Sequence, residues 1–125
     1  MKKVALVARI LLGLIFLLFG LNGFLHFIPM PPPTGLAGQY FTVLFVSHYL
    51  VLVFLVQVIG GILLLANRFV PLAIALLGPV LVNILMFHFL LAPAGLPLAV
   101  FTAALWLIVF FSVRQAFAGL FVSRT

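Results

Sequence analysis

The sequence predicts an all-α integral membrane protein built as a four-helix bundle. Of its 125 residues, 68% are hydrophobic and 5% are charged, whereas a soluble domain has charges on about a quarter of its residues. The apolar residues form four long runs, and the run from Phe69 to Leu91 would be roughly 34 Å long as a helix, enough to cross a bilayer. We therefore expect one transmembrane domain that covers residues 1–125.

The first apolar run follows two lysines and continues to Ile28. Its length of about 25 residues exceeds the core of a signal peptide, and no A-x-A cleavage pattern follows, so we expect a spanning helix over residues 4–28. Arg9 lies close enough to the start of this helix for its long side chain to reach the membrane surface, and we interpret it as an anchor. A proline-rich segment that begins at Pro29 ends the helix.

A shorter apolar and aromatic stretch follows at about residues 35–46. Joined to the next run, it would make a helix too long for one span, so we expect a short re-entrant or interfacial helix and a break near Ser47. The remaining spans are expected at about residues 48–66, 69–91 and 97–114.

The six cations predict the orientation of these spans. With four spans, the N-terminus, the turn at Arg68 and the C-terminus share one side of the membrane, and that side carries every Lys and Arg of the chain. Positive charge marks the cytoplasmic side, so we expect both termini to be cytoplasmic. Because the cations are spread over separate regions, this membrane interpretation explains them better than nucleic-acid binding does.

The chain contains no Asp, Glu or Cys. It therefore lacks the carboxylates needed for paired acid and base catalysis or for calcium and magnesium sites, and the thiolates needed for iron–sulfur clusters. An independent enzyme would have almost no general acid, base or nucleophile. We expect no catalytic residue and no dedicated metal site, and at most a non-catalytic subunit of an oxidoreductase.

Few polar side chains lie within the predicted spans. Gln57 falls near the membrane midplane, and Asn22 and Asn83 lie further toward the outer side. Gln57 shares a helix face with Gly60 and Gly61, which permit close backbone approach, so we expect it to face a neighbouring helix. Two roles remain open for the three amides, namely hydrogen bonds between helices and contacts to a ligand such as the carbonyls of a quinone.

All three histidines, His26, His48 and His88, fall in the outer half of the predicted bundle. Imidazole is the only good axial ligand in the chain, which makes them candidates to ligate haem or a chlorophyll-type pigment, or to hydrogen-bond a quinone. A bis-histidine haem would require His26 and His88 at one depth. Local hydrogen bonding at the membrane interface and proton transfer are the alternatives. The candidate cofactor-binding residues are Asn22, His26, Gln57, Asn83 and His88.

Four motifs follow one another along the chain: FGLNGF at 19–24, VIGGILLL at 58–65, NRFVP at 67–71 and NILMFH at 83–88. In this order they resemble the DoxX family of small bacterial membrane proteins, over nearly the whole chain. The resemblance implies a compact four-helix protein of the bacterial inner membrane, associated with quinone-linked oxidoreductases or with sulfur or thiol redox. Many relatives carry Glu where this chain has Gln57. If that Glu handles protons in the relatives, this chain has lost the proton-handling group and keeps only an amide that forms hydrogen bonds.

Two functions are consistent with these observations. The first is a small accessory subunit of a respiratory or photosynthetic electron-transport complex, which packs through its apolar helices against the lipid bilayer and other membrane subunits. The second is a DoxX-like quinone-linked oxidoreductase subunit that binds quinone or haem in the outer half of the bundle. The absence of every carboxylate and thiol favours the first.

Overall fold

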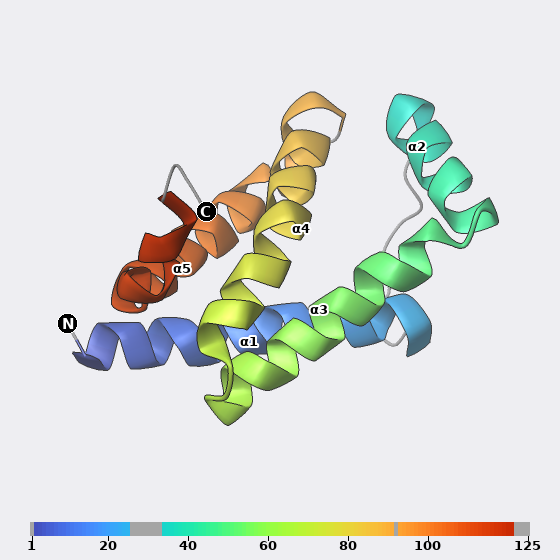
Figure 1. Cartoon of the computed structure of the whole chain (residues 1–125). Helices are drawn as coiled ribbons and strands as arrows, with labels where there is room; N and C mark the ends of the chain where they lie inside the picture. The colour runs from blue at the N-terminus through green and yellow to red at the C-terminus, as the bar shows by residue number, and fades with distance from the viewer. Residues whose placement is uncertain (1, 26–33, 92, 122–125) are drawn as a thin grey trace.

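The computed structural model describes residues 2–25, 34–91 and 93–121, and these residues form helices joined by short turns (Figure 1). The predicted all-α fold class is confirmed. The α-helices are α1 (Lys2–Leu25), α2 (Gly35–Val46), α3 (Tyr49–Ala66), α4 (Val70–Leu90) and α5 (Leu96–Ser112), and two 3₁₀ helices are η1 (Pro93–Gly95) and η2 (Arg114–Phe121). By length and composition, α1, α3, α4 and the η1–α5 segment are each able to cross a membrane.

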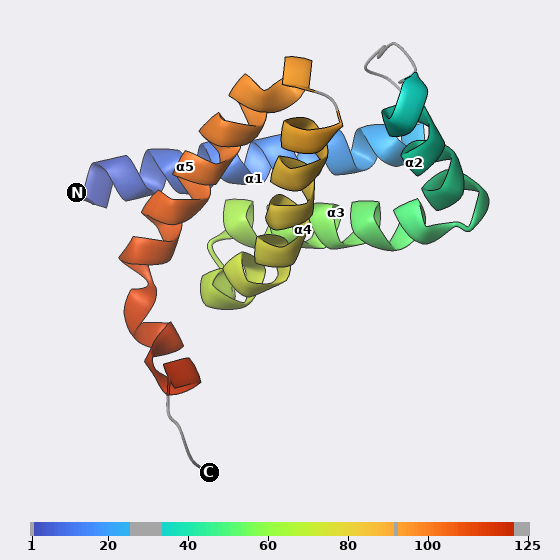
Figure 2. The same cartoon turned by 90° about the horizontal axis from the view of Figure 1, so that it is seen from above.

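The four long helices form two antiparallel pairs. One pair is α1 with α3, and the other is α4 with α5 (Figure 1). Seen from above, both helices of the second pair run steeply across the direction of α1 (Figure 2). The short helix α2 lies beside the start of α3, at the end of the molecule away from α5 (Figure 2). The start of α1, the turn between α3 and α4, and the end of α5 lie at the opposite end (Figure 1).

Glycine residues bring α1 and α3 into close contact. A Cβ atom added to Gly61 would lie 2.7 Å from the backbone nitrogen of Leu17 and 2.8 Å from the carbonyl oxygen of Gly13. Further along the same interface, a Cβ atom on Gly20 would lie 3.0 Å from the Cβ atom of Gln57. Such close backbone approach is the usual way in which transmembrane helices pack, because lipid provides no hydrophobic drive to hold helices together.

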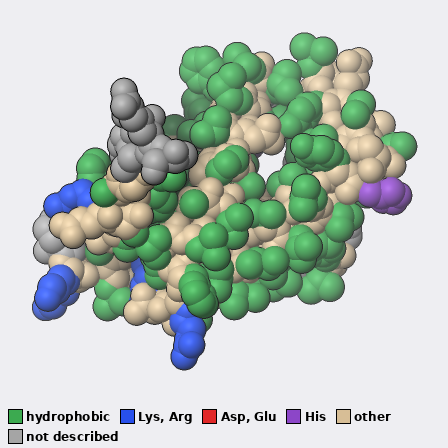
Figure 3. All heavy atoms as spheres, viewed as in Figure 1, with side chains coloured by type: hydrophobic (Ala, Val, Ile, Leu, Met, Phe, Trp, Pro, Cys, Tyr) green, Lys and Arg blue, Asp and Glu red, His purple; other side chains and the backbone are tan. Residues whose placement is uncertain are grey.

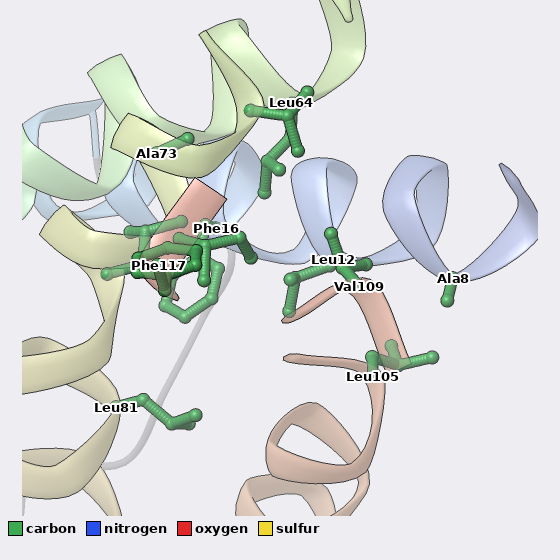
Figure 4. Packing of buried hydrophobic residues seen from close by; sticks show 12 residues of the cluster. Ala8, Leu12, Phe16, Leu64, Ala73, Leu81, Leu105, Val109 and Phe117 are labelled. Carbon is green, nitrogen blue, oxygen red and sulfur yellow. The ribbon is translucent and has the colours of Figure 1, made fainter. Parts of the chain in front are cut away.

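The hydrophobic core lies where α1, α3, α4 and α5 meet. Ala8, Leu12 and Phe16 recur every four residues and therefore share one face of α1, which is almost fully buried (Figure 4). The other buried members of this cluster are Leu64, Val70, Ala73, Ile74, Leu77, Leu81, Leu105, Val109 and Phe117.

The segment after α5 packs back onto this core. Phe117 in η2 is 8% exposed, and its ring centroid lies 5.1 Å from that of Phe110, which in turn stacks on Trp106 at 5.3 Å. The fourth span is expected to reach residue 114, but α5 ends at Ser112. Polar side chains take up carbonyl groups of its last turn: Ser112 donates to the carbonyl of Val109 at 2.6 Å, and Arg114 donates to that of Phe111 at 2.7 Å.

Residues in left-handed conformation separate α2 from α3 and α3 from α4. His48 (φ 62°) divides α2 from α3, next to the break expected near Ser47. Asn67 (φ 54°) ends α3, and the N–H groups of Asn67 and Arg68 donate to the carbonyls of Leu64 and Leu63, as in a Schellman-type cap. Asn tolerates this conformation because its short polar side chain forms local hydrogen bonds.

Candidate functional site

Gln57 is the most buried of the predicted site residues that the structure describes. Only 5% of it is exposed, and it lies on α3 at the interface with α1, where its stem packs beside Gly20. Its Oε1 atom is buried and accepts no hydrogen bond from any described residue. An unsatisfied buried acceptor costs about 1–3 kcal/mol, so this atom is a natural contact point for a donor from outside the described chain.

Asn22 lies on α1 at a similar depth to Gln57. The α1 segment from Gly20 to Gly23 runs along α3 from Gln57 to Phe54, which places Asn22 within about one helical turn of Gln57 in depth. Asn22 is 8% exposed. The structure therefore buries two of the three predicted amides at a similar depth.

Asn83 takes part in a hydrogen bond between helices, one of the two roles that the sequence left open. It is exposed on α4, and its Oδ1 atom accepts a hydrogen bond from the Tyr40 hydroxyl of α2 at 3.1 Å. The ring of Phe87, one turn further along α4, packs 5.5 Å from Tyr40 and 5.0 Å from Phe41. Asn83 thus joins α2 to α4.

The histidines do not gather in the described part of the chain. His88 is half-buried in the last turn of α4, where its ring packs against Gly95 of η1 and lies 5.2 Å from Phe87. His48 is exposed at the corner between α2 and α3, and His26 lies outside the described residues. The His26–His88 haem pair therefore stays a prediction, and no group of three metal-ligating side chains occurs among the described residues.

The partner of Asn83 was not predicted from the sequence. Tyr40 and the neighbouring Phe41 belong to an aromatic cluster with Phe87 and His88. Asn83 and Phe87 are four residues apart and therefore share one face of α4, which was the available signal. What the sequence lacked was any sign that the short helix α2 packs against that face.

Arg9, which the sequence predicts as an anchor at the membrane surface, also bonds within the helix bundle. Its guanidinium is half-buried and donates to the carbonyl of Leu64, with a longer contact of 3.5 Å to that of Leu65. These carbonyls belong to the last turn of α3, where the helix dipole favours a cation. Arg9 therefore caps α3 from α1.

The described cations lie at one end of the molecule. In the space-filling view, Lys and Arg side chains are seen at the left and lower left, the end that carries the start of α1 and the turn between α3 and α4 (Figure 3). Histidine lies at the opposite end, and apolar side chains cover most of the surface between (Figure 3). Positive charge is therefore concentrated at one end, as it is in a protein that crosses a bilayer.

Comparison with protein-family models, with curated proteins and with solved structures finds no match for this chain.

Proposed function

We propose that this chain is a small accessory subunit of a larger electron-transport complex in the bacterial inner membrane. Its apolar helices contact lipid and the membrane helices of its partners. On this proposal the protein contributes packing surface and supplies no catalytic group of its own.

The observation that carries the proposal is that the polar side chains form hydrogen bonds between helices. Tyr40 links α2 to α4 through Asn83, Arg9 links α1 to α3, and the indole N–H of Trp106 links α5 to the carbonyl of Ile74 in α4 at 3.1 Å. These groups hold helices together instead of converging on a cleft. The open recess of about 510 Å³ beside α2 is lined by Thr34, Gly35, Gly38, Gln39, Thr42 and Val43, none of which titrates near neutral pH.

The outer faces of the helices support the same proposal. Large apolar side chains are exposed on every spanning helix, for example Leu18, Leu52, Val82 and Phe101, at 45%, 58%, 60% and 50%. A surface of this kind is stable only against lipid or other apolar helices.

Extraction of native membranes in mild detergent, native gel separation and mass spectrometry of the band that contains this protein test the proposal. We expect the protein to migrate with a large assembly that contains haem, flavin or iron–sulfur subunits. Migration as a free small protein under conditions that leave known respiratory complexes intact would contradict the proposal.

One observation favours a second function, a DoxX-like subunit that binds quinone. The Oε1 atom of Gln57 lacks a donor among the described residues, and the hydroxyl of a quinol is a donor that fits an apolar helix interface.

The two functions separate in one experiment. Gln57→Leu is expected to remove bound quinone from the purified protein if the second function holds, and to leave complex assembly unchanged. Asn83→Leu is the matched control, because it removes an exposed amide that lies away from Gln57. Equal quinone content in both variants and the wild type would exclude Gln57 as a quinone contact.

A further inference from the structure

We infer that the cationic end of the molecule contains a binding site for a phosphate group. A pocket of about 210 Å³ opens there between three elements, the first turns of α1, the turn between α3 and α4, and the end of α5. Lys2, Arg9, Asn67, Val70 and Ser112 are among the residues that line it. We call it the basic pocket.

Helical geometry aims two cations into this pocket. Lys2 and Arg9 are seven residues apart, which places them on one face of α1, two turns from each other, with Ala5 and Leu6 of the pocket wall between them. Arg9 is held in position by its bonds to the last carbonyls of α3, and it still has further N–H donors on its guanidinium.

The charge of the basic pocket has no counterpart among the side chains of the protein. The sequence contains no Asp or Glu, so no side-chain carboxylate is able to neutralise a half-buried Arg9. Backbone carbonyls carry only partial charge, and a cation withdrawn from water without an anion is costly. A phosphate supplies both the charge and the several acceptors that Lys and Arg recognise.

One further wall of the basic pocket is suited to an anion. Val70, which lines the pocket, is the first residue of α4, and the N-cap residue Phe69 makes no side-chain cap, so the positive end of that helix dipole lies beside the pocket without a side-chain cap. The exposed amide of Asn67 adds donors at the rim.

Two sources supply this chemistry at a membrane surface, the headgroup of an anionic phospholipid and free phosphate. Basic pockets between transmembrane helices on the cytoplasmic side are typical sites for anionic headgroups. The two sources share the phosphate group, and they differ in whether acyl chains are needed for binding.

Native mass spectrometry of the purified full chain tests the site. The probes are phosphatidylglycerol, phosphatidylcholine and inorganic phosphate, each titrated in the same detergent. We expect Lys2→Gln to weaken binding of the preferred phosphate probe about fivefold, since each basic residue near an anionic surface contributes about that factor. Lys3→Gln removes the same charge one residue away, outside the residues that line the basic pocket, and is expected to leave binding unchanged.

Arg9→Gln is a second variant, whose helical content is checked by circular dichroism because Arg9 also caps α3. A folded Arg9→Gln protein with weakened binding supports the site. Binding of phosphatidylglycerol but not inorganic phosphate assigns the site to a lipid headgroup, and binding of inorganic phosphate assigns it to the free ion. The inference is overturned if no probe is preferred over phosphatidylcholine, or if Lys3→Gln weakens binding as much as Lys2→Gln does.

Discussion

At the scale of single residues, this chain uses backbone carbonyls where other proteins use carboxylates. Arg9 donates to Leu64 and Arg114 donates to Phe111, in each case in the last turn of a helix, where carbonyls lack an intrahelical partner. The indole N–H of Trp106 donates to the carbonyl of Ile74 in α4. The next carbonyl, that of Ala75, lacks its usual helical donor because Pro79 has no N–H. Arg9 and Arg114 thus satisfy carbonyls at helix ends, and Trp106 joins α5 to α4.

Gln57→Leu is expected to stabilise the ligand-free protein. The substitution removes a buried acceptor that has no donor among the described residues and replaces it with an apolar side chain of similar size. We expect the free energy of unfolding in detergent to rise by about 1 kcal/mol. Chemical unfolding followed by circular dichroism measures it, with Gln39→Leu on the exposed face of α2 as control. A loss of stability in Gln57→Leu would mean that the amide is already satisfied.

Trp106→Phe is expected to lower the free energy of unfolding by about 1 kcal/mol. The variant loses the hydrogen bond to Ile74 and part of the ring that covers Gly78, at 3.4 Å from the position of a Cβ there. Thermal unfolding by circular dichroism gives the comparison, and Phe101→Leu, half exposed on the same helix, is expected to change little. Equal losses in both variants would argue against a specific role for the indole N–H.

At the scale of helices, small residues determine how closely α1 and α3 approach. Gly13 and Gly20 on α1 meet Gly61 and the Gln57 stem on α3, and Gly60 accommodates Leu77 of α4. Because backbone lies against backbone at Gly61, no side-chain movement is able to make room there. The approach of α1 to α3 therefore depends on the absence of a Cβ atom at Gly61.

Gly61→Ala is expected to destabilise the fold by about 2 kcal/mol, since overpacking a tight contact forces the backbone to shift. The new Cβ atom would lie 2.7 Å from the backbone nitrogen of Leu17. Gly119→Ala, where nothing lies within 4 Å, is the matched control and is expected to be neutral. Denaturant unfolding of both variants in one detergent measures the difference. Unchanged stability in Gly61→Ala would show that the helices separate at little cost.

The helices themselves were largely predictable from the sequence. Residues 35–46 were expected as a short helix, and α2 covers Gly35–Val46. Hydropathy, proline and Asn67 mark such boundaries locally, which is why sequence reasoning finds them. The contacts that position the site were not predictable, because the partner of Arg9 is a backbone carbonyl 55 positions away and the partner of Asn83 is 43 positions away. Nothing near Phe117 in the sequence indicates that η2 returns to the core.

At the scale of the whole molecule, the described positive charges lie at the end where the start of α1, the α3–α4 turn and the end of α5 meet. The start of α1, the α3–α4 turn and the end of α5 share one end of the structure, and the described cations lie there (Figures 1 and 3). The corner between α2 and α3 lies at the other end, with His48 exposed. The described cations thus mark one end of the molecule, and the positive-inside rule predicts that this end is cytoplasmic.

Because the chain lacks cysteine, single cysteines test this orientation without further changes. Cysteines at Phe69 and Gln115, both exposed at the cationic end, leave every charge in place and are expected to react with a membrane-impermeant maleimide only after the inner membrane is permeabilised. Cysteines at Ser47 and Ala94 are expected to react in cells with an intact inner membrane, since these positions lie at the other ends of the same helices. The cysteine-free parent measures background labelling. Reversed labelling would place the termini outside the cytoplasm, and equal labelling of all four positions from one side would mean that the helices lie on the membrane without crossing it.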